Sequence, residues 1–245
     1  MVARVQAQSE TPAGLRVTMG HVHLNVLDAG RARHFWVGLL GGAPVKIGPG
    51  EAIRFPGVLV MLRESERVEN RGESAVEYLG FRARDLPRLA ARLEEGGVRL
   101  TRLGPSWLSV FTPEALRVDL YGFPSQPEAI RFHRVHFRIP DPEALRSWYQ
   151  RTFGLRTTEP LALELPGATL TFAPAPHPPA PSQGRALDHI SFEVRNLEAF
   201  CRQLERQGIQ FDKPFRRFEK VKAAAAVLTD PSRMTVSLTE GLDAF

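Results

Sequence analysis

The sequence predicts an α+β protein built from four tandem βαβββ modules, and three observations support this fold. Four segments share one order of features: an alternating strand, an Asp or Asn, an amphipathic helix and a glycine. The segments begin at residues 21, 78, 134 and 189, with similar spacing in the two halves of the chain. β-rich stretches follow every helix, at residues 58–62, 109–121, 168–172 and 224–239. Agreement in order, spacing and helix ends is typical of a repeated structural unit.

Each module carries the same local signals in the same order. A strand of alternating polar and apolar residues comes first, at residues 21–26, 78–83, 134–139 and 189–194. An Asp or Asn follows, which can accept hydrogen bonds from the free amides of a helix's first turn: Asp28, Asp85, Asp141 and Asn196. Apolar residues three and four positions apart give each helix one buried face. A glycine is expected to end each helix in the left-handed conformation: Gly41, Gly96, Gly154 and Gly208.

Period-two alternation assigns two faces to the strands. In the first strand, His21, His23 and Asn25 face away from the helix-covered core. The same division gives the other leading and closing strands a polar face: Tyr78, Gly80, Arg82, Arg117, Asp119, Tyr121, Arg134, His136, Arg138, His189, Ser191, Glu193, Thr235, Ser237 and Thr239. Histidine, arginine and tyrosine dominate this face rather than the lysine and glutamate of a solvated surface. We therefore expect two curled sheets that enclose polar clefts, with the helices on the outside.

The modules fall into two halves. The predicted organisation is an N-terminal tail (residues 1–16), a first two-module domain (17–122), a linker (123–132) that contains Pro124 and Pro127, and a second two-module domain (133–245). The repeats leave the pairing of the modules open. Either neighbouring modules pair side by side, or they pair crosswise, the first with the fourth and the second with the third.

Composition narrows the function classes. The chain has 245 residues, of which 43% are hydrophobic and 24% charged, and no apolar run is long enough to cross a membrane. A single cysteine, Cys201, excludes an internal disulfide and a cysteine-based zinc site. The net charge of +5 is a mild excess, so we expect a solvated arginine-rich surface and no nucleic-acid partner. The expected partner is a small-molecule ligand, the expected state a monomer or homodimer, and the expected location cytoplasmic. Export is the alternative, because residues 5–8 resemble the end of a cleaved signal.

The motifs resemble those of the vicinal oxygen chelate (VOC) superfamily, which includes glyoxalase I, extradiol dioxygenases and bleomycin-resistance proteins. Residues 21–26 and 189–194 are similar to its leading His-x-x-apolar-x-Val strand, and residues 230–238 to its closing Asp-Pro strand. The resemblance runs from about residue 18 to residue 240. It implies one divalent metal held by two leading histidines and a closing carboxylate. Two neutral imidazoles and a carboxylate leave open positions for adjacent oxygens of a substrate.

The metal-ligand positions that the resemblance implies are not kept as a set. The leading positions are His21, Tyr78, Arg134 and His189, and the closing positions are Met61, Asp119, Thr171 and Ser237. Arg134 would place a permanent cation at the metal position, and paired with Asp119 it would replace the metal. We therefore expect no cofactor. The alternative is a divalent metal (Fe, Mn, Ni or Zn) bound by His21, His23 and Asp119, because His23 projects from the same strand face as His21.

The leading functional hypothesis is a glyoxalase- or dioxygenase-like VOC protein whose metal site is degenerate. It would bind a small anionic or oxygen-rich molecule in a cleft, with metal-independent acid–base chemistry as an option. The candidate catalytic residues are His189, His136 and Tyr78. The candidate ligand-binding residues are His21, His23, Arg134, Arg138, Asp119, Ser237 and Glu193. His189 could be a general base with Glu193 or Ser237 nearby, whereas His133 and His177 are expected on the surface or in a linker.

Two alternatives remain open. One is a metal-dependent extradiol dioxygenase or glyoxalase-type lyase or isomerase that uses His21, His23 and Asp119. The other is a non-catalytic protein that sequesters a small molecule, like the resistance proteins. Whether the chain is an enzyme is not decided by its residues, because one fold carries many functions.

Overall fold

The computed structural model describes residues 17–47, 50–69 and 74–242. The predicted tail, residues 1–16, lies outside the described residues. The elements of the first module are β1 (Val17–Val26), α1 (Ala29–Arg33), the π-helical segment η1 (His34–Leu39), β2 (Ala43–Ile47), β3 (Gly50–Phe55) and β4 (Val58–Glu64). Those of the second are β5 (Val76–Ala83), α2 (Leu86–Glu95), β6 (Thr101–Gly104), β7 (Trp107–Phe111) and β8 (Arg117–Gly122).

The second half repeats this order. The elements of the third module are β9 (Ile130–Ile139), α3 (Pro142–Phe153), β10 (Arg156–Glu159), β11 (Ala162–Leu165) and β12 (Ala168–Pro174). Those of the fourth are β13 (Leu187–Val194), α4 (Leu197–Arg206), β14 (Lys213–Phe218), the 3-10 turn η2 (Glu219–Val221), β15 (Ala223–Thr229) and β16 (Thr235–Glu240). The predicted α+β fold of four βαβββ modules is confirmed.

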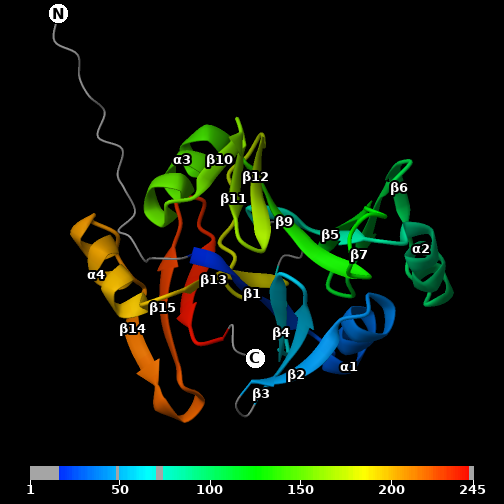
Figure 1. Cartoon of the computed structure of the whole chain (residues 1–245), viewed down its shortest axis with the longest axis horizontal. Coiled ribbons are helices and arrows are strands. Elements are labelled where there is room, and N and C mark those ends of the chain that lie inside the picture. Colours follow the sequence, from blue (N-terminus) through cyan, green and yellow to red (C-terminus); the bar gives the residue numbers. More distant parts are fainter. Residues whose placement is uncertain (1–16, 48–49, 70–73, 243–245) are drawn as a thin grey trace, which may run out of the picture.

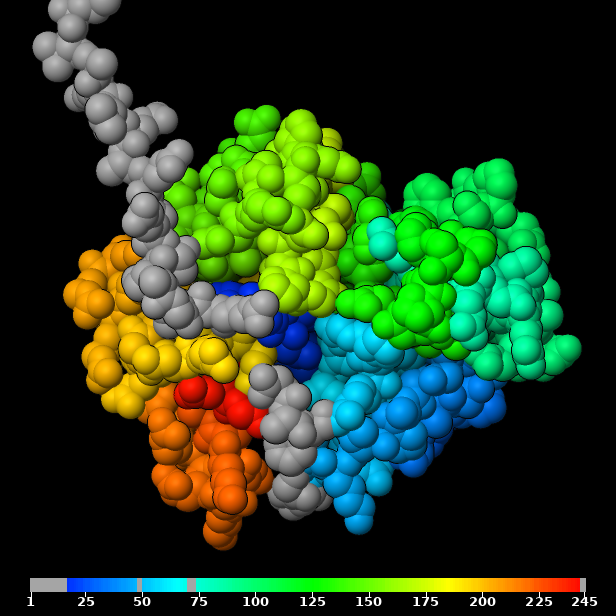
Figure 2. Space-filling view, in the orientation of Figure 1, coloured from blue at the N-terminus to red at the C-terminus, as the bar shows by residue number. Residues whose placement is uncertain are grey.

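The strands form two eight-stranded sheets, and each sheet joins modules from both halves of the chain. Sheet A has the order β14-β15-β16-β13-β1-β4-β3-β2, and sheet B the order β10-β11-β12-β9-β5-β8-β7-β6. The modules therefore pair crosswise, the first with the fourth and the second with the third. In each sheet two leading strands run antiparallel at the centre, β1 beside β13 and β5 beside β9. Figure 1 shows the helices at the periphery, and Figure 2 shows the blue first module close to the yellow-to-red fourth module.

Local interactions at the helix ends follow the predicted signals at most positions. Asp28, Asp85 and Asp141 each accept a hydrogen bond from a backbone amide of the first helical turn. Asn196 does not cap α4: it adopts a left-handed conformation, and Glu240 accepts from its amide instead. Gly96 keeps a negative φ, and Gly97 next to it takes the left-handed conformation after α2.

The core lies on the faces of the sheets that the helices cover. The apolar residues that alternate with the polar ones in β1 are buried, and large aromatic side chains fill the space around them. The two sheets meet where the β3–β4 turn touches the β11–β12 turn. Gly57 has a φ of 96°, and a Cβ atom there would come within 2.8 Å of the Gly167 carbonyl oxygen. Among the described residues, no helix combines the length and the apolar character needed to cross a membrane.

Candidate functional site

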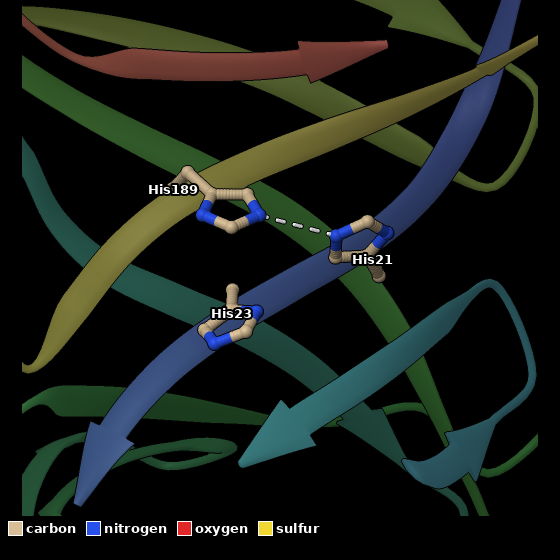
Figure 3. A group of neighbouring side chains, drawn as sticks. All are labelled: His21, His23 and His189. Carbon is tan, nitrogen blue, oxygen red and sulfur yellow. Dashed lines mark hydrogen bonds between the residues drawn. The ribbon is translucent and has the colours of Figure 1, made fainter. Parts of the chain in front are cut away.

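Three histidines from the two central strands of sheet A converge on one point. His23 of β1 and His189 of β13 are directly opposite each other in the strand register. Their rings stack with centroids 4.7 Å apart, and His21 Nε2 lies 3.2 Å from His189 Nε2. One ring nitrogen of each histidine lies within 4.8 Å of the others. Figure 3 shows the three rings facing one another between the two strands. We call His21, His23 and His189 the histidine cluster.

Two bulges in the strand pairing lie beside this cluster. On β1, Gly20 and His21 together oppose the single residue Ser191 of β13. On β13, Asp188 is an extra residue between the partners of two consecutive β1 positions. A bulge turns an extra side chain out of the regular alternation. Asp188 consequently interacts with His189 on the polar face, where strict alternation would have placed it on the core face.

The Asp188 carboxylate contacts His189 directly, and other donors fix the orientation of this carboxylate. Its Oδ2 lies 2.8 Å from His189 Nδ1. Its Oδ1 accepts from the Asn25 side-chain amide at 3.1 Å and from the Gly184 backbone amide at 2.9 Å. The guanidinium of Arg63 lies 3.6 Å from Oδ1 and donates to the Asn25 side-chain oxygen at 2.9 Å. Both carboxylate oxygens therefore act as acceptors in fixed directions.

Burial and charge favour neutral imidazoles at His21 and His23 and an ionised carboxylate at Asp188. Burial, with the neighbouring His189 and His23, holds the pKa of His21 well below its ordinary value. Burial and the same neighbour His189 lower the pKa of His23 to about 4. Burial alone would raise the pKa of Asp188, but hydrogen bonds from His189, Gly184 and Asn25 outweigh it and lower that pKa. Neutral imidazole is the form that binds a metal ion.

The Asp188 contact also assigns the tautomer of His189. An ionised carboxylate only accepts, so His189 Nδ1 carries a proton, and in the neutral form of the ring the lone pair is on Nε2, the nitrogen that faces His21. This pairing of a carboxylate with the far nitrogen is the arrangement that orients metal-binding histidines in proteins. His21 Nδ1 and His23 Nε2 are buried and have no hydrogen-bond partner in the described part of the chain.

The spacing of two members of the histidine cluster, His21 and His189, suits a transition-metal ion. Two imidazole nitrogens bound to one ion at about 2.0–2.1 Å lie roughly 3.0–3.4 Å apart at ordinary coordination angles. The observed separation of His21 Nε2 and His189 Nε2 is 3.2 Å. Imidazole suits zinc, copper, iron and nickel, and three protein ligands with an open position are typical of a catalytic zinc site. The donor set therefore fits a divalent metal without a carboxylate ligand.

Sheet B has the same backbone arrangement with different side chains. Its leading strands pair Tyr78 with His136, and those rings stack with centroids 4.5 Å apart. The extra residue at the β5 bulge is Glu77, in the position of Asp188. By this register Arg134, His136 and Tyr78 correspond to His21, His23 and His189. The predicted catalytic residues His189, His136 and Tyr78 are thus divided between two sheets.

Glu77 contacts three basic side chains of sheet B. Its Oε1 lies 3.1 Å from Arg138 and 3.6 Å from Arg117, and its Oε2 lies 3.7 Å from His136. His136 Nδ1 lies 2.8 Å from the Thr171 hydroxyl. Burial lowers the pKa of His136, although Glu77 opposes that shift. Arg138, one of the predicted ligand-binding residues, is therefore paired with Glu77.

Asp119 takes no part in the histidine cluster. It lies on β8 of sheet B, fully buried, and accepts two hydrogen bonds from Arg117, at 2.8 and 2.9 Å. The Trp107 indole donates to it at 2.9 Å. The structure therefore does not assemble the predicted metal site of Asp119 with the two β1 histidines. The predicted pairing of Asp119 with Arg134 is also not formed, because Arg117 lies two residues away on the same strand face.

Two other predicted site residues of sheet A, Glu193 and Ser237, take no part in the histidine cluster. Glu193 accepts hydrogen bonds from the Thr239 hydroxyl at 2.7 Å and from backbone amides that follow β16. The carboxylate beside His189 is Asp188, whereas Glu193 is four positions further along β13. Ser237 is buried on β16 and pairs in register with Ser191.

His133 is not a surface or linker histidine. It is the extra residue of a bulge in β9, and its ring lies between two guanidinium groups. Arg134 Nη2 lies 3.0 Å from His133 Nε2, and Arg82 Nη2 lies 3.4 Å from it. Arg134 also lies over the Tyr121 ring, 5.2 Å from its centroid. Burial and the two arginines lower the pKa of His133 to about 3.

Period-two alternation missed the two carboxylates at the bulges, Asp188 and Glu77. A signal was present, because an acidic residue directly precedes the leading residue in both modules: Asp188 before His189, and Glu77 before Tyr78. Both lie one residue before the predicted strands, residues 189–194 and 78–83, and only the strand register reveals the bulges.

Comparisons with known proteins agree with this architecture. Residues 131–238 match the family described as the Glyoxalase/Bleomycin resistance protein/Dioxygenase superfamily. Glyoxalase I from Zea mays is 15% identical with a TM-score of 0.72, covering 92% of this chain and 93% of that one. A Zea mays glyoxalase I mutant has a TM-score of 0.73, 15% identity and coverage of 92% and 94%.

A more distant likeness is to the cppA protein of Streptococcus pneumoniae, with a TM-score of 0.58, 14% identity and coverage of 92% and 98%. No curated protein is similar to this chain in sequence. At these identities the structural likeness shows the fold alone. Residues 131–238 match the Glyoxalase/Bleomycin resistance protein/Dioxygenase superfamily, and the chain as a whole has the fold seen in glyoxalase I.

Proposed function

We propose that this chain is a metal-dependent VOC enzyme, a lyase or isomerase of the glyoxalase kind, whose divalent ion is held by the histidine cluster. The observation that carries the proposal is the convergence of three imidazole nitrogens within 4.8 Å of one another. The proposal keeps the predicted ligands His21 and His23 and replaces Asp119 by His189. The competing hypothesis is the metal-free small-molecule site expected from the absence of a closing carboxylate.

When bound, the ion would act as a Lewis acid on a substrate oxygen. Three neutral ligands leave its full double charge in place, whereas a carboxylate ligand would cancel part of it. Such a site favours a small substrate with two adjacent oxygens, at least one of which carries or develops negative charge. An anionic or oxygen-rich ligand is also what the sequence analysis predicts.

The residues of the chain have separate roles in this proposal. Asp188 keeps the His189 proton on Nδ1, so that Nε2 remains a ligand. Asn25 and Arg63 hold Asp188 in that orientation. The burial of His21 keeps its ring neutral and excludes water from one side of the site.

The direct test is the metal content of protein purified without a chelator. We expect about one transition-metal ion per chain by plasma mass spectrometry. His21→Ala and His189→Ala should each lower the occupancy at least tenfold after dialysis against zinc. His177→Ala is the matched control, because His177 is an exposed histidine in the loop before β13. Metal-free native protein that cannot be loaded, or loading unchanged by both cluster variants, would reject the metal and support the metal-free hypothesis.

The substrate class is tested in cobalt-loaded protein. Catechol carries two adjacent oxygens and serves as the probe. We expect it to change the visible absorption of cobalt, whereas phenol, with a single oxygen, should have a much weaker effect. Equal effects of the two compounds would contradict recognition of paired oxygens.

A further inference from the structure

A cluster of arginines lies in sheet B, away from the histidine cluster. A cavity of 620 Å³ is lined there by residues that include Arg82 of β5, Arg131 and His133 of β9, and Thr169 of β12. Arg82 and Arg131 are direct partners across the β5–β9 pairing, so their side chains leave neighbouring backbone positions. The cavity is within the size range of small-molecule sites.

Positive charge at this cavity is only partly balanced. Arg82 and Arg134 have no carboxylate partner in the described part of the chain, and both direct an NH2 group at His133 Nε2. Arg131 pairs with Glu128, outside the cavity lining, and Arg156 pairs with Glu164 at the cavity wall. The one acidic group of the lining is therefore already engaged by an arginine.

The geometry of His133 makes it a spacer between the two guanidinium groups. It is the extra residue at the bulge of β9, and its ring contacts both arginines. Its Nε2 faces both arginines and therefore accepts, which requires a neutral ring with the proton on Nδ1. The Arg134 Nε is buried and has no hydrogen-bond partner in the described chain. Burial and the nearby Arg134 and Arg131 also lower the pKa of Arg82.

We propose that this cavity binds a small molecule through a phosphate or carboxylate group placed between Arg82 and Arg131. Guanidinium groups bind such oxyanions through paired hydrogen bonds. An oxyanion would relieve the repulsion among the cations and give Arg82 an anionic partner, which it lacks among the described residues. The hydroxyl of Thr169, which pairs in register with Arg134, is an additional donor at the cavity wall. The site is independent of the metal proposed in sheet A.

Calorimetric titration tests the proposal, with inorganic phosphate and malonate as separate probes in a chloride buffer of constant ionic strength. We expect saturable binding of at least one probe, with one site per chain. Arg82→Gln should weaken binding at least tenfold. Arg131→Gln should weaken it severalfold, and it should leave folding intact because Arg131 is exposed. Arg206→Gln, which removes an exposed charge at the end of α4, is the matched control and should bind as the native chain does.

A further variant distinguishes this site from the metal site. His21→Ala removes a proposed metal ligand and should leave the binding of the probes unchanged. Binding that survives Arg82→Gln and is lost in His21→Ala would place the anion at the histidine cluster and overturn the proposal. Absence of binding for both phosphate and malonate, or equal loss in Arg206→Gln, would also overturn it.

Discussion

The role assigned to Asp188 can be tested by Asp188→Asn, which keeps the size of the side chain and removes its charge. All three close contacts of Asp188 require an acceptor. Oδ1 accepts from Asn25 and from the Gly184 amide, and Oδ2 is the partner of His189 Nδ1. Asparagine has one acceptor and one donor group, so either orientation of its amide directs an N–H at another N–H.

Either orientation weakens the metal site. If the amide nitrogen faces His189, the ring proton moves to Nε2 and that nitrogen can no longer bind an ion. If the amide oxygen faces His189, the nitrogen opposes Asn25 and Gly184, and the side chain is pushed out of position. Loss of such an orienting carboxylate costs about 10–100-fold in metal affinity. This corresponds to about 1.4–2.7 kcal/mol of binding free energy.

The assay is a zinc titration in competition with a coloured chelator, on protein first stripped of metal. Asp212→Asn is the control, because Asp212 is an exposed carboxylate that accepts one hydrogen bond from Thr229, at 2.7 Å. It should bind zinc as the native chain does. Native affinity in a folded Asp188→Asn variant would refute the argument that this carboxylate orients His189.

Three further predictions concern stability, measured by urea unfolding. Gly57→Ala should lower the free energy of unfolding by about 1–3 kcal/mol, because a φ of 96° is unfavourable for alanine and the new Cβ atom would lie 2.8 Å from the Gly167 carbonyl oxygen. Gly184→Ala is the control, because Gly184 also has a positive φ but open space around it, and it should cost less. Equal costs would exclude the close contact as the cause. His133→Gln should make the free energy of unfolding less sensitive to acid between pH 6.5 and 4. With a folded pKa of about 3, His133 gains its proton in this range only in the unfolded chain, and this lowers the stability of the native protein by up to about 3 kcal/mol at pH 4. The measurement is made in phosphate-free buffer. An unchanged pH profile would contradict this prediction. Tyr149→Phe removes the donor 2.7 Å from the buried Asp230 and should cost about 1–3 kcal/mol; a cost near zero would mean that water replaces the phenol.

Much of the fold could be predicted because its signals are local. Asp28, Asp85 and Asp141 cap the helices that they precede, and each cap depends only on residues within one helical turn. Asn196 fails as a cap because Glu240, from a distant strand, supplies the acceptor. Of the candidate site, the polar strand face was predictable at His21, whereas Asp188 was not.

Alternation along the chain determined that His21, His23, His189 and Asp119 are polar-face residues, because a strand projects its side chains to opposite sides in turn. Which of them meet depended on the strand order. Crosswise pairing of the modules sets His189 beside His23 and leaves Asp119 in the other sheet with Arg117. The bulge that turns Asp188 toward His189 arises in the register between β1 and β13, a contact between opposite ends of the sequence. Hydrogen bonding between distant strands, which no local pattern encodes, therefore decided the composition of the site.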